Sequence, residues 1–296
     1  MNMGDSRIVV RMADWLDWAR SLPMKGVDFL YADPPFNTGR EQVSPPNGTS
    51  AAISADRSRE TGLSYADRFG SAQDFIAWLR SRLAATIPAL KPTALVALHV
   101  DWRTSHHVRL LLDELFGADR FVNHLIWSYG LGGSSPRRFA RKHDDILLYC
   151  VDPDRYYFDP PRVPATSRRL AGQSKKATDV LDMPPVEEPG IHVAAGVLDV
   201  PSLNNMARER TGYPTQKPLA LMELLIGACC PPDGLVVDPC CGSGTTLVAA
   251  QRLGRRAAGC DVNPDAVRIA RARLEQTATG HHPAAGTTAR TGGTIP

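Results

Sequence analysis

The stretch LVVDPCCGSGTTLVAAQRLGRRAAGCD (Leu235–Asp261) decides how this chain folds. It begins with a short apolar strand, turns through a loop that contains glycine, and continues into a helix over Thr245–Leu253. A second strand, Ala257–Asp261, ends on an acidic residue. A strand, a glycine turn and a helix in this order are typical of α/β proteins that bind a nucleotide-like ligand at the carboxyl ends of parallel strands.

The residues of the glycine loop limit the ligands that it can bind. Leu247 stands where a dinucleotide fingerprint has its third glycine, and the lysine of a P-loop is missing, so neither NAD nor ATP is favoured. Asp238 can accept from a ligand ammonium, Gly242 and Gly244 permit close packing, and Asp261 can accept from ribose hydroxyls. S-adenosylmethionine has all of these groups. The alternative is a structural glycine turn in which Asp261 caps the following helix.

A second buried strand, Gly26–Ala32, ends at Asp33-Pro34-Pro35-Phe36. If this strand neighbours the one before the glycine loop, the two loops form one active site. The Asp33 carboxylate and the Pro34 carbonyl could then accept the two N–H groups of an exocyclic amine. Phe36 offers a face on which a base extruded from a nucleic acid can stack. The alternative is an ordinary turn after a strand.

Composition sets the broad class. The chain has 296 residues, of which 43% are hydrophobic and 22% charged, as is usual for soluble globular proteins. Its apolar runs are shorter than the roughly 20 residues of a membrane helix. The N-terminal MNMGDSRIVVRMADW lacks the apolar core of a secretory signal, so we expect a cytoplasmic protein. The six cysteines have no zinc-type spacing, so we expect reduced thiols and no metal site.

Positive charge is concentrated in one part of the chain. The formal net charge is only +3, but residues 137–176 contain ten Lys and Arg against five Asp and Glu. This window favours contact with a nucleic acid, and the alternative is a solvated charged face.

Four segments together resemble the amino-methylating DNA methyltransferases of prokaryotes, which make N6-methyladenine or N4-methylcytosine. They are YADPPFNTG (Tyr31–Gly39), LKPTALVALHVDWRTSHHVRLLLDELFG (Leu90–Gly117), GYPTQKP (Gly212–Pro218) and VVDPCCGSGTTLVAAQRLGRRAAGCDVNPDAV (Val236–Val267). The catalytic motif precedes the cofactor motif, an order similar to that of the β class. The resemblance covers most of residues 7–275.

The resemblance implies a Rossmann-like methyltransferase fold of the α/β class, with a mainly parallel central sheet and permuted motif order. Residues 1–150 would form the catalytic part of the domain, and residues 211–276 its S-adenosylmethionine-binding part. Residues 151–210, which are Pro-rich, basic and weakly periodic, would be a small inserted DNA target-recognition lobe that adds nothing to the core. We expect residues 277–296 to be a disordered tail.

The resemblance also implies the site residues. The catalytic motif would be Asp33, Pro34, Pro35 and Phe36. The residues expected to hold S-adenosylmethionine are Asp238, Gly242, Gly244, Thr245, Asp261, Thr215, Gln216 and Lys217. Lys217 would meet the methionine carboxylate, or else be a surface residue at a helix start. The expected DNA-binding residues are Arg137, Arg138, Arg141 and Lys142. One departure is Cys240, which stands where the family commonly has phenylalanine.

The implied function is methyl transfer from S-adenosylmethionine to the exocyclic amine of a flipped base in a specific sequence of double-stranded DNA. Adenine N6 is favoured, because Asp33 begins the catalytic motif and cytosine-N4 enzymes more often resemble S-P-P. The alternatives are a cytosine-N4 enzyme, an RNA or protein methyltransferase, and a non-catalytic DNA-binding protein. A homodimer and a cognate restriction endonuclease are left open as partners.

Overall fold

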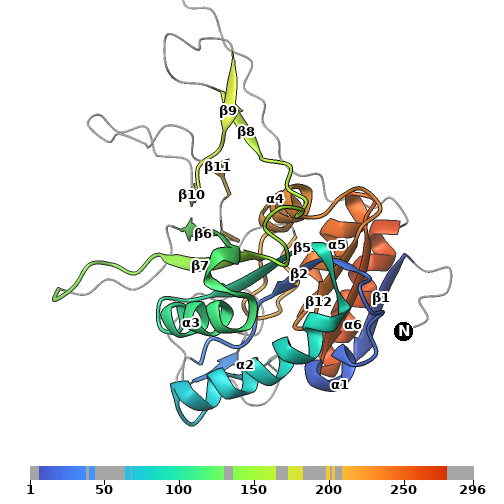
Figure 1. Ribbon diagram of the computed structural model, residues 1–296. Coiled ribbons are helices and arrows are strands. Elements are labelled where there is room, and N and C mark those ends of the chain that lie inside the picture. The colour runs from blue at the N-terminus through green and yellow to red at the C-terminus, as the bar shows by residue number, and fades with distance from the viewer. Residues whose placement is uncertain are drawn as a thin grey trace, which may run out of the picture.

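A computed structural model of the chain describes residues 7–37, 40–43, 64–67, 69–129, 136–164, 173–182, 198–200, 202–203 and 209–278. Within these residues, nine strands form one central sheet that carries helices on both faces (Figure 1). The helices are α1 (Trp15–Ala19), α2 (Ala72–Thr86), α3 (Ser105–Phe116), α4 (Leu219–Cys229), α5 (Thr245–Arg252) and α6 (Pro264–Ala278). The strands of the sheet are β1 (Ile8–Met12), β2 (Val27–Ala32), β5 (Leu90–Val100), β6 (Phe121–Ser128), β7 (His143–Cys150), β10 (Val180–Asp182), β11 (Leu198–Asp199), β12 (Leu235–Asp238) and β13 (Arg256–Asp261).

The order of the sheet brings the two expected site loops together. It is β1-β13-β12-β2-β5-β7-β6-β10-β11. The strands from β1 to β5 in this order are parallel, whereas β7 is antiparallel to both of its neighbours. Strands β12 and β2 pair directly, with Val236 opposite Phe29. The predicted α/β fold with a mainly parallel sheet is confirmed. The condition for a single active site, that these two strands are neighbours, is met.

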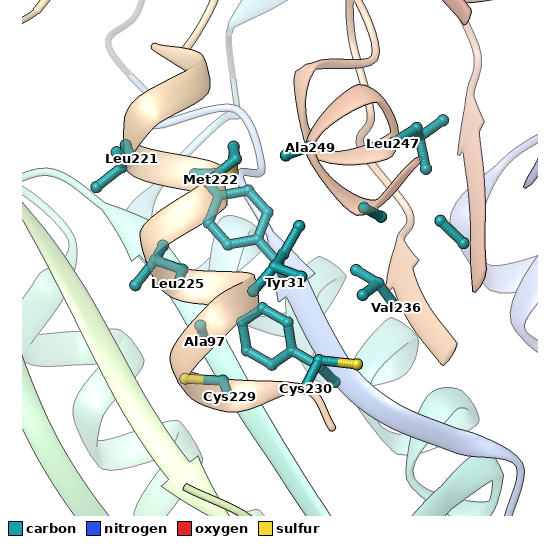
Figure 2. Packing of buried hydrophobic residues seen from close by; sticks show 14 of the residues in the cluster. Tyr31, Ala97, Leu221, Met222, Leu225, Cys229, Cys230, Val236, Leu247 and Ala249 are labelled. Carbon is teal, nitrogen blue, oxygen red and sulfur yellow. The ribbon is translucent and has the colours of Figure 1, made fainter. Parts of the chain in front are cut away.

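The central strands are apolar because both faces of the sheet are covered. Every residue of β2 and of β12 is buried. Helices α4, α5 and α6 pack on one face, and α1, α2 and α3 pack on the other. Figure 2 shows the first of these layers, where Met222 and Leu225 of α4 lie over the sheet beside Tyr31. This packing holds the carboxyl ends of β2 and β12 in a fixed place.

The 151–210 segment contributes more to the sheet than its sequence suggests. Strand β10 pairs with β6, and β11 pairs with β10. Leu181 and Val200 are buried in the core, and the Trp127 indole donates to the Val200 carbonyl over 2.8 Å. The expectation that this segment adds nothing to the core is therefore wrong. Strands of two or three residues are too short to show the alternation by which a strand is recognised.

Other parts of the chain lie outside the sheet or outside the described residues. The strands β8 (Arg162–Pro164) and β9 (Ser174–Lys176) form a separate antiparallel pair, and so do β3 (Arg40–Val43) and β4 (Ser64–Asp67). Helix α6 extends to Ala278, and the rest of the expected disordered tail lies outside the described residues. No helix in the described ranges is long and apolar enough to cross a membrane.

Candidate active site

The loops that follow β2 and β12 line one pocket of about 360 Å³ at the carboxyl edge of the sheet. Apart from Gly244, every residue expected in the catalytic and cofactor sites contributes to its wall. These residues are Asp33, Pro34, Pro35, Phe36, Thr215, Gln216, Lys217, Asp238, Gly242, Thr245 and Asp261. Segments from three distant parts of the sequence therefore meet in one site.

The catalytic motif is held from two sides. The Lys217 ammonium lies 2.5 Å from Asp33 Oδ2 and 5.1 Å from the centroid of the Phe36 ring. Phe36 also stacks on the ring of the buried His99, with the ring centroids 5.9 Å apart and the ring planes inclined by 27°. The motif is thus fixed by an ion pair and an aromatic stack, in addition to the stiffness of its two prolines.

Two further carboxylates stand in the cofactor part of the pocket. Asp238 is buried and accepts from the Cys240 backbone N–H over 3.0 Å, and burial raises the pKa of its carboxyl to about 7. Asp261 accepts from the backbone N–H groups of Gly242 and Asn263, each over 2.9 Å. Burial also raises the pKa of Asp261. Asp261 thereby ties the glycine loop to the end of β13.

The two glycines of the loop have different structural roles. Both have positive φ, +49° at Gly242 and +78° at Gly244. A side chain at Gly244 would place its Cβ 2.7 Å from the Cβ of Ala270 on α6. Gly244 therefore permits the close approach of α6 to the start of α5, and it is not part of the pocket wall. At Gly242 the nearest atom to an added Cβ is the Tyr213 ring, at 3.3 Å.

The segment before α4 closes the opposite wall. Gln216 Oε1 accepts from the Thr211 backbone N–H over 2.8 Å, and its Nε2 donates to the Glu209 carbonyl over 2.8 Å. Thr215 has φ of +56° and turns the chain toward the pocket. Gln216 therefore fixes the shape of this loop through hydrogen bonds within the chain, and Lys217 extends from it to Asp33.

The start of α5 is fixed by a half-buried arginine from α6. Arg273 donates to Thr245 Oγ1 and to the Ser243 carbonyl, each over 2.9 Å. Burial lowers the pKa of Arg273 to about 10. Thr245 thus lines the pocket in an orientation set by Arg273.

A buried polar network behind Phe36 was missed by sequence reasoning. The His99 Nδ1 lies 2.9 Å from the Tyr31 hydroxyl, and its Nε2 lies 3.2 Å from Asp144 Oδ2. The Tyr129 hydroxyl donates to the other Asp144 oxygen over 3.0 Å. Burial opposes ionisation of Asp144, but the hydrogen bond and charge of His99 hold the pKa of this carboxyl below its usual value. The only signal in the sequence was a single histidine inside the apolar strand that became β5.

The basic residues expected to bind DNA lie outside the pocket. Arg137, Arg138, Arg141 and Lys142 belong to the segment between β6 and β7. The Arg141 guanidinium stacks on Trp102, 3.4 Å from the ring centroid. Among the described residues, no group of His, Cys, Asp or Glu side chains is arranged to hold a metal ion.

The geometry defines a Rossmann-like enzyme with a D-P-P-F loop and a glycine loop in one pocket, and comparison with known proteins identifies its family. The model of the N6/N4 methyltransferase family, described as DNA methylase, matches residues 27–272. The chain belongs to this family. The type II methyltransferase M.ScaI of Streptomyces caespitosus is 28% identical over 284 residues, covering 92% of this chain and 83% of that protein. The DNA adenine methyltransferase YhdJ of Escherichia coli strain K12 is 24% identical over 273 residues, covering 92% of this chain and 84% of that protein.

Solved structures agree with the fold. The cytosine-N4-specific PvuII DNA methyltransferase superposes with a TM-score of 0.60 at 16% identity, covering 93% of this chain and 91% of that chain. The complex of M1.HpyAVI with SAM gives a TM-score of 0.57 at 20% identity, covering 90% of this chain and 98% of that chain. The predicted family and fold are confirmed, as is the predicted class of enzyme, a site-specific DNA methyltransferase.

Proposed function

We propose that this enzyme transfers a methyl group from S-adenosylmethionine to the exocyclic amine of a base flipped out of a specific DNA sequence, with adenine N6 as the favoured target. The observation that carries this proposal is that the Asp33 loop and the glycine loop share one pocket. A methyl donor held by the second loop and an amine held by the first would be side by side, which is the main requirement for direct transfer.

The chemistry of the pocket fits S-adenosylmethionine. Asp238 is a buried carboxylate with a raised pKa, and a ligand ammonium would stabilise its charged form. Asp261 keeps lone pairs that ribose hydroxyls can use, because each of its oxygens accepts one backbone N–H here. Trp15, Phe69 and Trp78 supply aromatic wall suited to a purine. When bound, S-adenosylmethionine supplies an electrophilic methyl group on a sulfonium sulfur.

The catalytic motif would activate the amine. The lone pair of an exocyclic amine is conjugated with the base ring and is poorly nucleophilic. The Asp33 carboxylate and the Pro34 carbonyl accept its two N–H groups, and so favour the tetrahedral nitrogen of the transition state over the planar ground state. Phe36 stacks on the base and is itself backed by His99. Lys217 holds the Asp33 carboxylate in the pocket.

The preference for adenine is supported by Asp33 as the first residue of the motif. The relatives include a DNA adenine methyltransferase, YhdJ, and a cytosine-N4-specific enzyme, that of PvuII, so cytosine N4 is the second candidate target.

Double-stranded DNA is the substrate in this proposal, and the enzyme acts on it in the cytoplasm. A second copy of this chain and a cognate restriction endonuclease are the further partners that the resemblance allows. Light scattering on the purified protein, with and without DNA, tests the homodimer.

The direct test is incubation of unmethylated genomic DNA with the protein and isotope-labelled S-adenosylmethionine, followed by mass spectrometry of the nucleosides. Labelled N6-methyladenine is expected. Labelled N4-methylcytosine would keep the mechanism and change the target, and no labelled nucleoside would contradict the proposal. The matched variant is Asp33→Ala, for which we expect turnover to fall about a thousandfold or more. Its cofactor Kd should stay within about threefold of wild type, since Asp33 serves the amine. Turnover within about tenfold of wild type would contradict this role of Asp33.

A further inference from the structure

Phe139 is the most exposed large apolar side chain in the part of the chain that the structure describes, with 98% of its surface open to solvent. It lies in the segment PRRFARK (Pro136–Lys142), where two cationic residues precede it and two follow, and no acidic residue intervenes. Burial of such a ring against a partner is favourable. A partner with flat apolar faces beside negative charge fits this segment, and DNA has both in its stacked bases and its phosphates.

The segment projects from the edge of the sheet where the active site lies. Strand β7 is antiparallel to β5, and Asp145 near its start pairs with Val100 at the end of β5. The Tyr129 backbone N–H donates to the Lys142 carbonyl over 2.9 Å and so links the end of β6 to the end of this segment. Figure 1 shows the chain running out from the start of β7 beyond the body of the domain. DNA with its target base in the pocket would therefore meet this segment.

The segment Pro136–Lys142 is anchored through Trp102, which lies just after β5. Arg141, two residues after Phe139, stacks on Trp102 with 3.4 Å between guanidinium carbon and ring centroid. Trp102 follows β5 and lies three residues after His99, the side chain on which Phe36 stacks. The Arg141–Trp102 stack therefore fixes the backbone two residues from Phe139, while the Phe139 ring itself stays exposed.

We propose that Phe139 enters the DNA base stack beside the target and fills the space that the flipped base leaves, while Arg137 and Arg138 contact the flanking phosphates. The inference rests on the proposed function, because it assumes a flipped base. A phenyl ring has no hydrogen-bonding group, so it stacks on any neighbouring pair and stabilises the open duplex without reading its sequence. Phe139 is thus a positioning residue for base flipping.

The test compares Phe139→Ala with wild type on three DNAs that contain the recognition sequence. They are the matched duplex, the same duplex mismatched at the target base, and the target strand alone. We expect the single-turnover rate of methylation of the matched duplex to fall about tenfold or more, because the variant no longer stabilises the duplex with its target base flipped out. Methylation of the mismatched duplex and the single strand should stay within about threefold of wild type, since their target base is already free.

A fluorescent 2-aminopurine at the target position of the matched duplex gives a second readout. Its emission should rise when wild-type protein binds, and it should rise less when Phe139→Ala binds. Phe139→Trp should restore both the emission and the methylation of the matched duplex. The control is Leu110→Ala on α3, an apolar side chain that is 68% exposed, for which no change is expected. Full activity of Phe139→Ala on the matched duplex, an equal loss on all three DNAs, or a change only in self-association would overturn the inference. Wild-type protein that methylates none of them would instead overturn the proposed function, and this inference with it.

Discussion

The Lys217 ammonium lies 2.5 Å from the Asp33 carboxylate, although 184 positions separate the two residues in the sequence. Both side chains are largely buried, with 10% and 17% of their surfaces exposed, so solvent screens the pair only in part. The resemblance assigned Lys217 to the methionine carboxylate, whereas the structure places it on the catalytic motif. The two assignments predict different kinetic defects.

Lys217→Met should lower the rate of methyl transfer more than it weakens cofactor binding. Asp33 would lose the partner that fixes its orientation, and an acceptor displaced by a small distance loses much of its effect on the transition state. We expect single-turnover rates to fall about a hundredfold, and the cofactor Kd measured by calorimetry to rise less than about fivefold. A large rise in Kd with an unchanged rate would instead support contact with the methionine carboxylate.

Cofactor affinity should rise with pH as Asp238 ionises. Burial raises the pKa of this carboxyl to about 7, so the free protein carries mostly the neutral form at pH 6 and mostly the charged form above pH 7. Only the charged form attracts a ligand ammonium. The Kd for S-adenosylmethionine should therefore fall roughly five- to tenfold between pH 6 and pH 7.5. The Asp238→Asn variant should bind S-adenosylmethionine weakly at both pH values. If its Kd showed the same pH dependence as wild type, the titrating group would be one other than Asp238.

Some features of the site arise from local sequence patterns, and these could be predicted. Other features arise from the pairing of segments that are distant in the sequence, and these could not. The stretch Leu235–Asp261 was predictable because strand, turn and helix signals adjoin one another. Asp33 was expected at the carboxyl edge of the sheet, where ligands bind, but its place beside the glycine loop depended on the pairing of β2 with β12. The pair of His99 and Asp144 was not predictable, because it depends on the alignment of β5 with β7. The ion pair of Lys217 with Asp33 depends likewise on how distant segments pack.

The same distinction explains the unexpected strands. Strand β1 was not predicted, since two of its five residues are exposed, only Val10 is buried, and the strand exists through its pairing with β13. The short strands β10 and β11 add to the sheet beyond β6, and they have little sequence pattern of their own. Elements whose stability comes from a neighbour have the weakest signal in the sequence.

Gly244→Ala should destabilise the fold. The residue has φ of +78°, and an added Cβ would lie 2.7 Å from that of Ala270, so both backbone strain and overpacking oppose the substitution. We expect a loss of about 2–4 kcal/mol in the free energy of unfolding, seen as a lower calorimetric Tm. The control is Gly227→Ala within α4, where an added Cβ meets nothing within 4 Å. That substitution should raise stability by about 0.5–1 kcal/mol. Equal Tm values for the two variants would show that the contact with Ala270 is unimportant.

Asp261→Ala should weaken cofactor binding without changing the methylated base. The substitution removes the acceptor for the ribose and also the hydrogen bonds to Gly242 and Asn263 that shape the loop. Since hydrogen bonds to a charged group contribute about 1.5–3 kcal/mol, we expect the cofactor Kd to rise about ten- to a hundredfold. Calorimetry measures the Kd, and mass spectrometry of nucleosides at saturating cofactor identifies the product. A different methylated base, or an unchanged Kd, would contradict the assignment.

Replacing Arg137 and Arg138 together by Ala should flatten the salt dependence of DNA binding. Each cation that neutralises a phosphate releases counterions, so the slope of log K against log salt should decrease in magnitude by about 1.8 for two lost contacts. Affinity should fall on cognate and unrelated duplexes alike, because phosphate contacts carry no sequence information. The matched control replaces Arg20, which follows α1, and Arg256, which begins β13, because both lie at the amino edge of the sheet. Fluorescence anisotropy at several salt concentrations gives the slopes. Equal slopes for the variant and wild type would place the DNA on another surface.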